Sequence, residues 1–219
     1  MTRSEYFGDW LKVLEGKEMD QTLSAISDKY GRSGGCCPLY TSIFKAFHVC
    51  DYNNLKSVWI GMDPYPEKRY ATGILFGNPP EVGENIAPSL RVIKDAVFRG
   101  TGGVIKDNSL ESIARQGVLM INYCLTTEEG KTGTDIMLWM PFITHLIKRI
   151  SEINSGIVYL LFGRIAQRLI PHINPKTSLI MTEKHPAYYS RQGEEMPSDI
   201  FRNFGKEIYN INKYRFSWE

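Results

Sequence analysis

The chain has 219 residues, a length typical of a single domain, and 42% of them are hydrophobic and 12% aromatic. This composition can bury a substantial core and excludes a disordered chain. The longest apolar runs, such as IVYLLFG at 157–163, are too short to span a bilayer, and the first ten residues lack the apolar core of a signal peptide. With a net charge of only +2, nucleic-acid binding would need a local basic patch. We expect a soluble, cytoplasmic protein without membrane contact.

The four cysteines, Cys36, Cys37, Cys50 and Cys124, form no CxxC pair. Zinc and iron–sulfur sites usually draw on such pairs, so we interpret all four as reduced structural thiols. We therefore predict no metal and no cofactor.

The N-terminal part, residues 1–37, is predicted to be a helical region that packs on the main domain, residues 38–219. The stretch GRSGGCCP at 31–38 is predicted to be a flexible separator between them. Short apolar runs then predict strands at 57–61, 117–125, 156–162 and 177–182. Helical spacing of apolar residues predicts helices at 88–98, 140–153, 164–173 and 199–211.

This alternation of strands and helices indicates the fold class. The near-continuous apolar strands are typical of parallel strands that are covered on both faces. We therefore predict a single α/β domain with a central, mainly parallel, four-stranded sheet and helices on both faces.

Polar residues stand where the predicted strands end. Ligands of open parallel sheets bind beyond the carboxyl ends of the strands, so these residues should meet at one edge of the sheet. They are Asp63 and Tyr65 after the first strand, Asn122 near the end of the second, Gly163 and Arg164 after the third, and His185 after the fourth.

Together these groups suit a planar ligand that makes hydrogen bonds. Asp63 could orient a water or stabilise positive charge, and His185 could donate to an oxygen that gains negative charge. Asn122 has a donor and an acceptor with which to bind one edge of a base, and Phe76 could stack on a ring.

Each residue also has a structural interpretation. Aspartate before proline commonly forms a turn, and His185 alone could be a structural histidine. Asn122 could satisfy backbone groups and Phe76 could belong to the core. Their joint position at strand ends favours the functional interpretation.

Other catalytic motifs are missing from the sequence. It contains no GxxxxGK[ST] phosphate loop, no GxGxxG turn, no GxSxG elbow and no HExxH helix. Asp63 also has no second carboxylate at a strand end, which disfavours a two-metal nuclease or phosphatase.

The motifs resemble those of family-one uracil-DNA glycosylases. GMDPYP at 61–66 is similar to the family's GQDPYH water-activating motif, and ARQGVLMINYCLT at 114–126 is similar to its WARQGVLLLNTVLT. Further similarities follow in order along the chain: PLYTSIFKAF (38–47), GILFGNPP (73–80), APSLRVI (87–93), IVYLLFGRIAQ (157–167), KHPAYYS (184–190) and FSW (216–218).

The resemblance implies a role for each matching residue. Asp63 would position the attacking water, and His185 would hydrogen-bond the uracil oxygen that gains charge. Asn122 would bind the uracil edge, Phe76 would stack on the base, and Tyr65 would exclude the thymine methyl. The remaining implied contacts are the backbone amide of Met62 for the substrate and, for DNA, Pro88, Ser89, Gly163, Arg164, Tyr188, Tyr189 and Ser190. The implied activity is hydrolysis of deoxyuridine in single- or double-stranded DNA to uracil and an abasic site, after the nucleotide is flipped out.

Two departures from the family pattern affect these expectations. Pro66 replaces a histidine, which removes a polar group near the water and could lower the rate. Tyr189 replaces the leucine that the family inserts into the base stack; we expect the tyrosine to act as the wedge. Because proteinaceous DNA-mimic inhibitors grip that leucine, we expect weakened inhibition, and we expect a monomer.

Two alternatives remain open at this stage. Poxviral relatives with a GxDPYP turn serve as processivity factors, so the chain could be a glycosylase-like DNA-binding or polymerase-accessory subunit with secondary activity. A different base preference within the superfamily is the other alternative, although Tyr65 and Asn122 both favour uracil.

Overall fold

The computed structural model describes residues 2–31 and 34–219. Its main sheet consists of four parallel strands in the order β3-β2-β5-β6. They are β2 (Ser57–Gly61), β3 (Val118–Asn122), β5 (Ile157–Phe162) and β6 (Ser178–Glu183). The predicted α/β fold with a four-stranded parallel sheet is confirmed.

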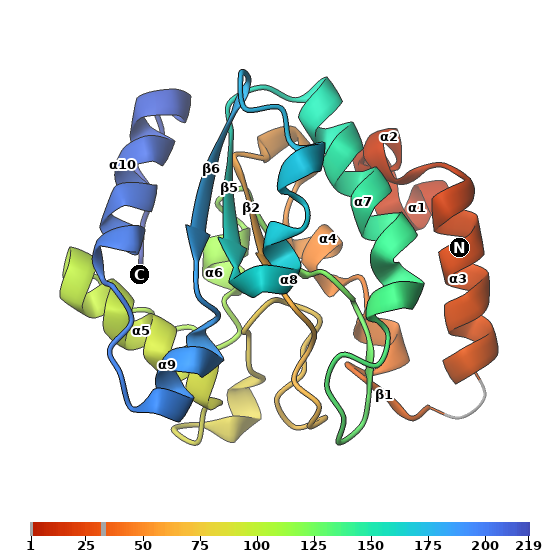
Figure 1. Ribbon diagram of the computed structural model, residues 1–219, viewed down its shortest axis with the longest axis horizontal. Coiled ribbons are helices and arrows are strands. Elements are labelled where there is room, and N and C mark those ends of the chain that lie inside the picture. Colours follow the sequence, from red (N-terminus) through yellow and green to blue (C-terminus); the bar gives the residue numbers. More distant parts are fainter. Residues whose placement is uncertain (1, 32–33) are drawn as a thin grey trace.

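Helices cover both sides of this sheet (Figure 1). In the view of Figure 1, α5, α9 and α10 lie on one side, whereas α1, α2, α3 and α7 lie on the other. The helices are α1 (Arg3–Phe7), α2 (Leu11–Leu14), α3 (Lys17–Tyr30), α4 (Lys45–Val49), α5 (Pro88–Thr101), α6 (Glu111–Ala114), α7 (Ile136–Ile153), α8 (Gly163–Gln167), α9 (Pro186–Gln192) and α10 (Asp199–Asn212).

Strands β2, β3 and β5 are buried along their whole length, as their apolar sequences require. Trp59 of β2 packs against Phe204 of α10 with ring centroids 5.1 Å apart, and against Trp218 near the C-terminus at 6.2 Å. Within α7, the rings of Trp139 and Phe142 are 5.2 Å apart and both are buried. These contacts pack the sheet between its helices, and the carboxyl ends of its strands meet at one edge.

The N-terminal helices pack on the same body as the sheet. The indole N–H of Trp10 donates to the carbonyl oxygen of Cys50 at 2.8 Å, and Phe7 meets Phe44 edge to face at 5.1 Å. Helix α3 runs beside α7 (Figure 1). The predicted helical character of this region agrees with α1 to α3, and these contacts support its packing on the main domain.

Three expectations about local structure were wrong. Helix α7 begins at Ile136 rather than at 140, with Pro141 inside it. The helix predicted at 164–173 is interrupted: α8 ends at Gln167 and a separate 3-10 turn follows at Ile170–His172. Pro171 has no N–H to continue the hydrogen-bond ladder, which explains the separate turn.

The predicted flexible separator is the third correction. Its Cys36–Cys37 segment forms β1, which is buried and pairs antiparallel with β4 (Thr127–Glu128). Arg32 and Ser33 of the same stretch lie outside the described residues. The small β1–β4 sheet brings residues 127 and 128 next to the N-terminal part of the chain.

Candidate active site

A tight turn after β2 presents Asp63 at the edge of the sheet. The carbonyl oxygen of Met62 accepts a hydrogen bond from the Cys124 amide at 3.1 Å, and that of Pro66 accepts one from the Gly130 amide at 2.8 Å. The turn is therefore fastened at its start and at its end. From the sequence, Pro66 is notable only because it replaces a histidine of the family pattern. In the structure its backbone carbonyl supplies one of these anchors.

A cavity of about 270 Å³ opens at this edge. It gathers the two predicted catalytic residues, the four predicted substrate contacts and one predicted DNA contact: Asp63 and His185, then Met62, Tyr65, Phe76 and Asn122, and finally Ser89. These residues come from five separate segments of the chain. Their convergence follows from the parallel sheet, because three of its strands end at this cavity.

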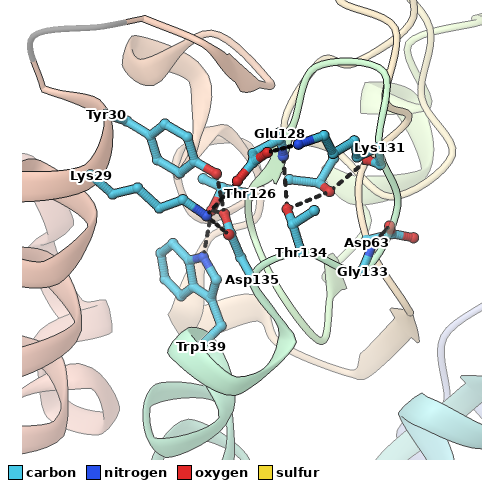
Figure 2. Close-up of polar contacts among 11 residues, drawn as sticks. Lys29, Tyr30, Asp63, Thr126, Glu128, Lys131, Gly133, Thr134, Asp135 and Trp139 are labelled. Atoms are coloured by element: carbon cyan, nitrogen blue, oxygen red, sulfur yellow. Dashed lines mark hydrogen bonds and ion pairs between the residues drawn. The ribbon is translucent and has the colours of Figure 1, made fainter.

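Asp63 is held by a backbone amide from another loop. The Gly133 N–H donates to its Oδ2 at 2.6 Å (Figure 2). Burial raises the pKa of Asp63 to about 6, while the hydrogen bond from Gly133 acts in the opposite direction. Asp63 is therefore mainly ionised at neutral pH, although its environment makes that charge unfavourable.

His185 is fixed in one tautomer. It is the N-cap of α9, and its Nδ1 accepts the Ala187 N–H at 3.2 Å. Burial, followed by the charge of Arg191, lowers the pKa of His185 to about 4, so the ring is neutral at pH 7. Since Nδ1 is an acceptor, the proton must be on Nε2, where it can be donated to a ligand.

Gly163 brings the end of β5 close to His185. Its φ of +84° is in the left-handed region, and a Cβ built there would be 3.1 Å from the Cβ of His185. A larger residue would have to displace the histidine. Gly163 therefore acts on the cavity through its lack of a side chain, although it does not line the cavity itself.

Asn122 lines the cavity and carries an unsatisfied acceptor. The residue is 7% exposed, and its Oδ1 is buried without a hydrogen-bond partner among the described residues. An unpaired buried amide oxygen costs about 1–3 kcal/mol, so its presence at a cavity points to a ligand that supplies the missing donor.

Phe76 is held in an unusual backbone conformation. Its φ is 60°, and its ring meets His185 edge to face at 5.3 Å. Non-glycine residues in the left-handed region cost about 1–3 kcal/mol and are concentrated at functional sites. Tyr65 lies nearby, and its hydroxyl donates to the Phe76 carbonyl oxygen at 3.3 Å.

The other predicted DNA contacts do not line the cavity. Pro88, Arg164 and Ser190 are exposed, and Tyr188 is half-buried with the Lys184 ammonium 4.2 Å from its ring centroid. These residues thus lie at the protein surface and not in the cavity.

Tyr189 lies differently from what a wedge requires. Its side chain is only 4% exposed, and its hydroxyl donates to Glu183 Oε1 at 2.6 Å. Burial, together with that carboxylate, raises the pKa of Tyr189. In this conformation the ring is turned inward, so insertion into DNA would require it to leave Glu183.

Sequence reasoning missed two residues of this site. Gly133 supplies the amide that holds Asp63, and Arg191 of α9 lines the cavity beside His185. Two glycines within four residues of the loop, GKTG at 130–133, were the available signal for a backbone contact. Arg191 carried no signal, because a surface arginine on a helix is commonplace.

Two observations limit other interpretations of the described residues. Within 2–31 and 34–219, no three histidine, cysteine, aspartate or glutamate side chains gather as a metal site would need. In the same ranges, no helix is both long enough and apolar enough to cross a membrane.

Comparison with known proteins identifies the family. The model of the uracil DNA glycosylase superfamily matches residues 47–208. The uracil-DNA glycosylase of Mycoplasmopsis pulmonis is 34% identical over 186 residues, which cover 83% of this chain and 81% of that protein. That of Lactobacillus acidophilus is 30% identical over 222 residues, covering 95% and 94% respectively.

Solved structures share the fold. Mimivirus uracil-DNA glycosylase aligns with a TM-score of 0.85 at 24% identity, covering 100% of this chain and 87% of that chain. A complex of a mimivirus UNG variant with UGI aligns with a TM-score of 0.84 at 23% identity, covering 100% and 89%. On the family match and the identity to these bacterial enzymes, this chain belongs to the uracil DNA glycosylase superfamily.

Proposed function

We propose that this protein is a DNA repair glycosylase that hydrolyses the N-glycosidic bond of deoxyuridine in DNA, releasing uracil and leaving an abasic site. One observation carries the proposal: one cavity is lined by an ionised carboxylate, a neutral histidine with its proton on Nε2 and an asparagine whose amide oxygen is unpaired. The bacterial relatives named uracil-DNA glycosylase support the same substrate.

The cavity offers a matching partner for each part of uracil. The Asn122 amide can bind the edge of the base that carries N3–H, which would donate to the buried Oδ1. Phe76 would stack on the ring, and the Met62 amide would add a donor. Tyr65 would occupy the space that the thymine methyl needs. A base must leave the helix to reach these groups, which costs a few kcal/mol of unstacking.

Bond cleavage would divide charge between the two catalytic residues. The C1′–N1 bond breaks, its electron pair leaves with uracil, and the base oxygen that gains charge accepts the Nε2–H of His185. The sugar becomes positively charged beside the Asp63 carboxylate, which also orients the water. The water oxygen then bonds to C1′ and passes its proton to the Asp63 carboxylate, which returns it to solvent. These steps need no metal and no covalent enzyme intermediate.

Small and basic residues around the cavity would hold the DNA backbone. Ser89, Gly163 and Ser190 would let main-chain amides approach phosphates, and the exposed Arg164 would add charge. Tyr189 would fill the vacated stack once released from Glu183. We further infer that a DNA-mimic protein inhibitor binds weakly here; equal inhibition of the parent and Tyr189→Leu would contradict this.

The direct test is uracil release from an oligonucleotide with one deoxyuridine, with EDTA present and a thymine strand as control. We expect the parent to act only on the uracil strand, and Asp63→Asn and His185→Leu to slow release by about 100-fold or more, because each removes charge stabilisation from the transition state. Asp28→Asn and His172→Leu, away from the cavity, are matched controls that should behave as the parent.

The opposite result would be equally clear. A parent protein that binds DNA but releases no base would contradict the glycosylase proposal and favour the accessory-subunit alternative.

A further inference from the structure

The amide that holds Asp63 belongs to loop 129–135, which connects β4 to α7. Gly133 has φ of +70°, and a Cβ there would be 3.1 Å from Met62 Cε. In this conformation its N–H donates to Asp63 Oδ2 at 2.6 Å. Whatever fixes the loop therefore also fixes the carboxylate.

The far end of the loop is anchored by Asp135. Its side chain is 0% exposed and takes part in three hydrogen bonds (Figure 2). Oδ1 accepts from the Lys29 ammonium at 2.6 Å, while Oδ2 accepts from the Tyr30 hydroxyl at 2.8 Å and the Thr126 hydroxyl at 2.5 Å. Two of these donors come from α3, so the carboxylate joins the loop to the N-terminal helices.

The use of Asp135 is unusual for its position. It is the N-cap residue of α7, where an aspartate normally accepts a backbone N–H of its own helix, yet its side chain makes no such bond. Both of its oxygens are turned toward α3 and Thr126 instead. The Thr126 hydroxyl in turn accepts from the indole N–H of Trp139 at 2.8 Å, which connects the same cluster to α7.

The short segment between Asp135 and Gly133 is braced as well. The Thr134 hydroxyl accepts the Glu128 N–H at 2.9 Å and is 3.1 Å from the Thr127 hydroxyl. Only one residue separates Gly133 from Asp135, so we expect a shift of the anchor to reach the Gly133 amide through this braced segment.

We propose that Asp135, held by Lys29 and Tyr30 of α3, is a positioning residue for the reaction: it fixes loop 129–135 so that the Gly133 N–H orients the Asp63 carboxylate. The inference rests on the proposed function, since it assigns a purpose to the orientation of Asp63. Loss of the anchor lets the amide move away, so the carboxylate loses its orientation and the hydrogen bond that favours its charged form.

The gentlest variant that tests this is Tyr30→Phe. It removes one hydroxyl from Asp135 and leaves the charge pair with Lys29 in place, so the protein should fold. Tyr52→Phe is a matched control, because the buried Tyr52 also loses one hydroxyl bond, to Asn154 Oδ1 at 3.1 Å, away from the loop. Asp135→Asn is the stronger variant.

Two measurements are made on each protein. The first is the pH profile of kcat and kcat/KM for uracil release. The second is the Gly133 amide resonance, isolated by labelling threonine carbonyl carbon with ¹³C and glycine nitrogen with ¹⁵N; only three Thr–Gly pairs, at 72–73, 101–102 and 132–133, then give signals. The signal whose titration is lost in Asp63→Asn is that of Gly133.

We expect Tyr30→Phe to lower kcat by about 3- to 10-fold with little change in KM, since a misplaced catalytic group affects the chemical step. The acid limb of its profile should move to higher pH, and the Gly133 amide proton should lose part of its downfield shift. Asp135→Asn should change each quantity further, and Tyr52→Phe should match the parent. None of these variants changes the other titratable or charged groups near Asp63, which are Tyr65, Cys124, His185 and Arg191.

The proposal is overturned if Tyr30→Phe and Tyr52→Phe give the same kcat, acid limb and Gly133 shift. The amide titration needs no turnover. A parent that releases no uracil would therefore refute the proposed function, while the Gly133 shift would still decide whether Asp135 controls the bond to Asp63.

Discussion

Asp63 and His185 share one cavity, and burial shifts both toward their neutral forms. It raises the pKa of Asp63 to about 6 and lowers that of His185 to about 4. For His185 the neutral form is also the one proposed to act. For Asp63 the working form is the charged one, so at neutral pH the folded protein bears an electrostatic cost at this residue.

That cost leads to a stability prediction for Asp63→Asn. The folded protein binds a proton at Asp63 more tightly than the unfolded chain, so ionisation between pH 3.8 and about 6 lowers the stability of the parent. At about 1.4 kcal/mol per pKa unit, the cost above pH 6 is about 3 kcal/mol as an upper bound. Asparagine is neutral and keeps an oxygen that can accept the Gly133 N–H.

We therefore expect Asp63→Asn to be more stable than the parent by about 1–3 kcal/mol at pH 8, with the difference vanishing below about pH 4. Urea unfolding of both proteins from pH 4 to 8 measures it. Taking the difference removes the contribution of His185, whose lowered pKa reduces stability in both proteins as the pH falls below about 6.5. A variant that is less stable at pH 8 would contradict the electrostatic explanation.

For single residues, the sequence predicted which residues belong to the candidate site better than it predicted the contacts that position them. Asp63, Asn122 and His185 could be predicted to meet because each lies at or just beyond the end of an apolar strand, and the structure places all three on one cavity. Asp135 was not found, because its three partners lie 9, 105 and 106 residues away in the chain. A single buried carboxylate leaves no periodic pattern, and aspartate before an apolar helix is explained locally as an N-cap.

Helix α9 connects the proposed catalytic histidine to the proposed wedge. His185 caps its start, and Tyr189 lies one turn later, held by Glu183 at the end of β6. Glu183 also accepts the Lys184 N–H at 2.6 Å, which orients its carboxylate. Glu183, at the end of β6, thus restrains the ring of Tyr189 through its hydroxyl.

Two variants separate the ring of Tyr189 from its hydroxyl. Tyr189→Phe keeps a stacking ring but loses the bond to Glu183, and Tyr189→Ala loses both. If the ring fills the vacated base stack, duplex uracil release should be at least as fast in Tyr189→Phe as in the parent, and about 10-fold slower in Tyr189→Ala.

Single-stranded substrate serves as the control for this pair. It has no opposing stack to fill, so we expect a smaller loss for Tyr189→Ala there. If Tyr189→Ala equals the parent on duplex DNA, the ring takes no part in opening the helix.

Element prediction succeeded for the long apolar strands and failed for the shortest elements. The strands were placed to within three residues, because uninterrupted apolar runs have few other uses in a chain of this composition. The two-residue strands β1 and β4 were missed, since their pairing depends on contact between residues about 90 positions apart. Helix α9 was missed because HPAYYS, with a proline and two tyrosines, has little helical preference.

In the whole molecule, the N-terminal helices pack on the part of the chain that carries the candidate active site. Trp10 and Phe7 are buried against residues of the main domain, and Lys29 and Tyr30 bind the loop beside Asp63. The division at residue 37 is therefore convenient for description, and we propose that the two parts unfold as one unit.

Cooperative unfolding can be checked with the buried Trp10. The four tryptophans report on different parts of the molecule, and the difference in fluorescence between the parent and Trp10→Phe isolates the N-terminal region. We expect this difference signal and the far-ultraviolet circular dichroism to share one urea midpoint. An earlier midpoint for the Trp10 signal would mean that the N-terminal helices unfold separately.

The close approach of Gly163 to His185 also limits how lineages carrying this site can diverge. Every other residue at 163 must adopt a backbone with φ near +84° and press a Cβ against the histidine, whereas the exposed Arg164 beside it has room to vary. Among random single-codon changes that preserve uracil release, position 163 should retain glycine while position 164 accumulates diversity. Two adjacent codons would thus change at different rates because of a contact with His185, which lies two residues beyond the end of β6.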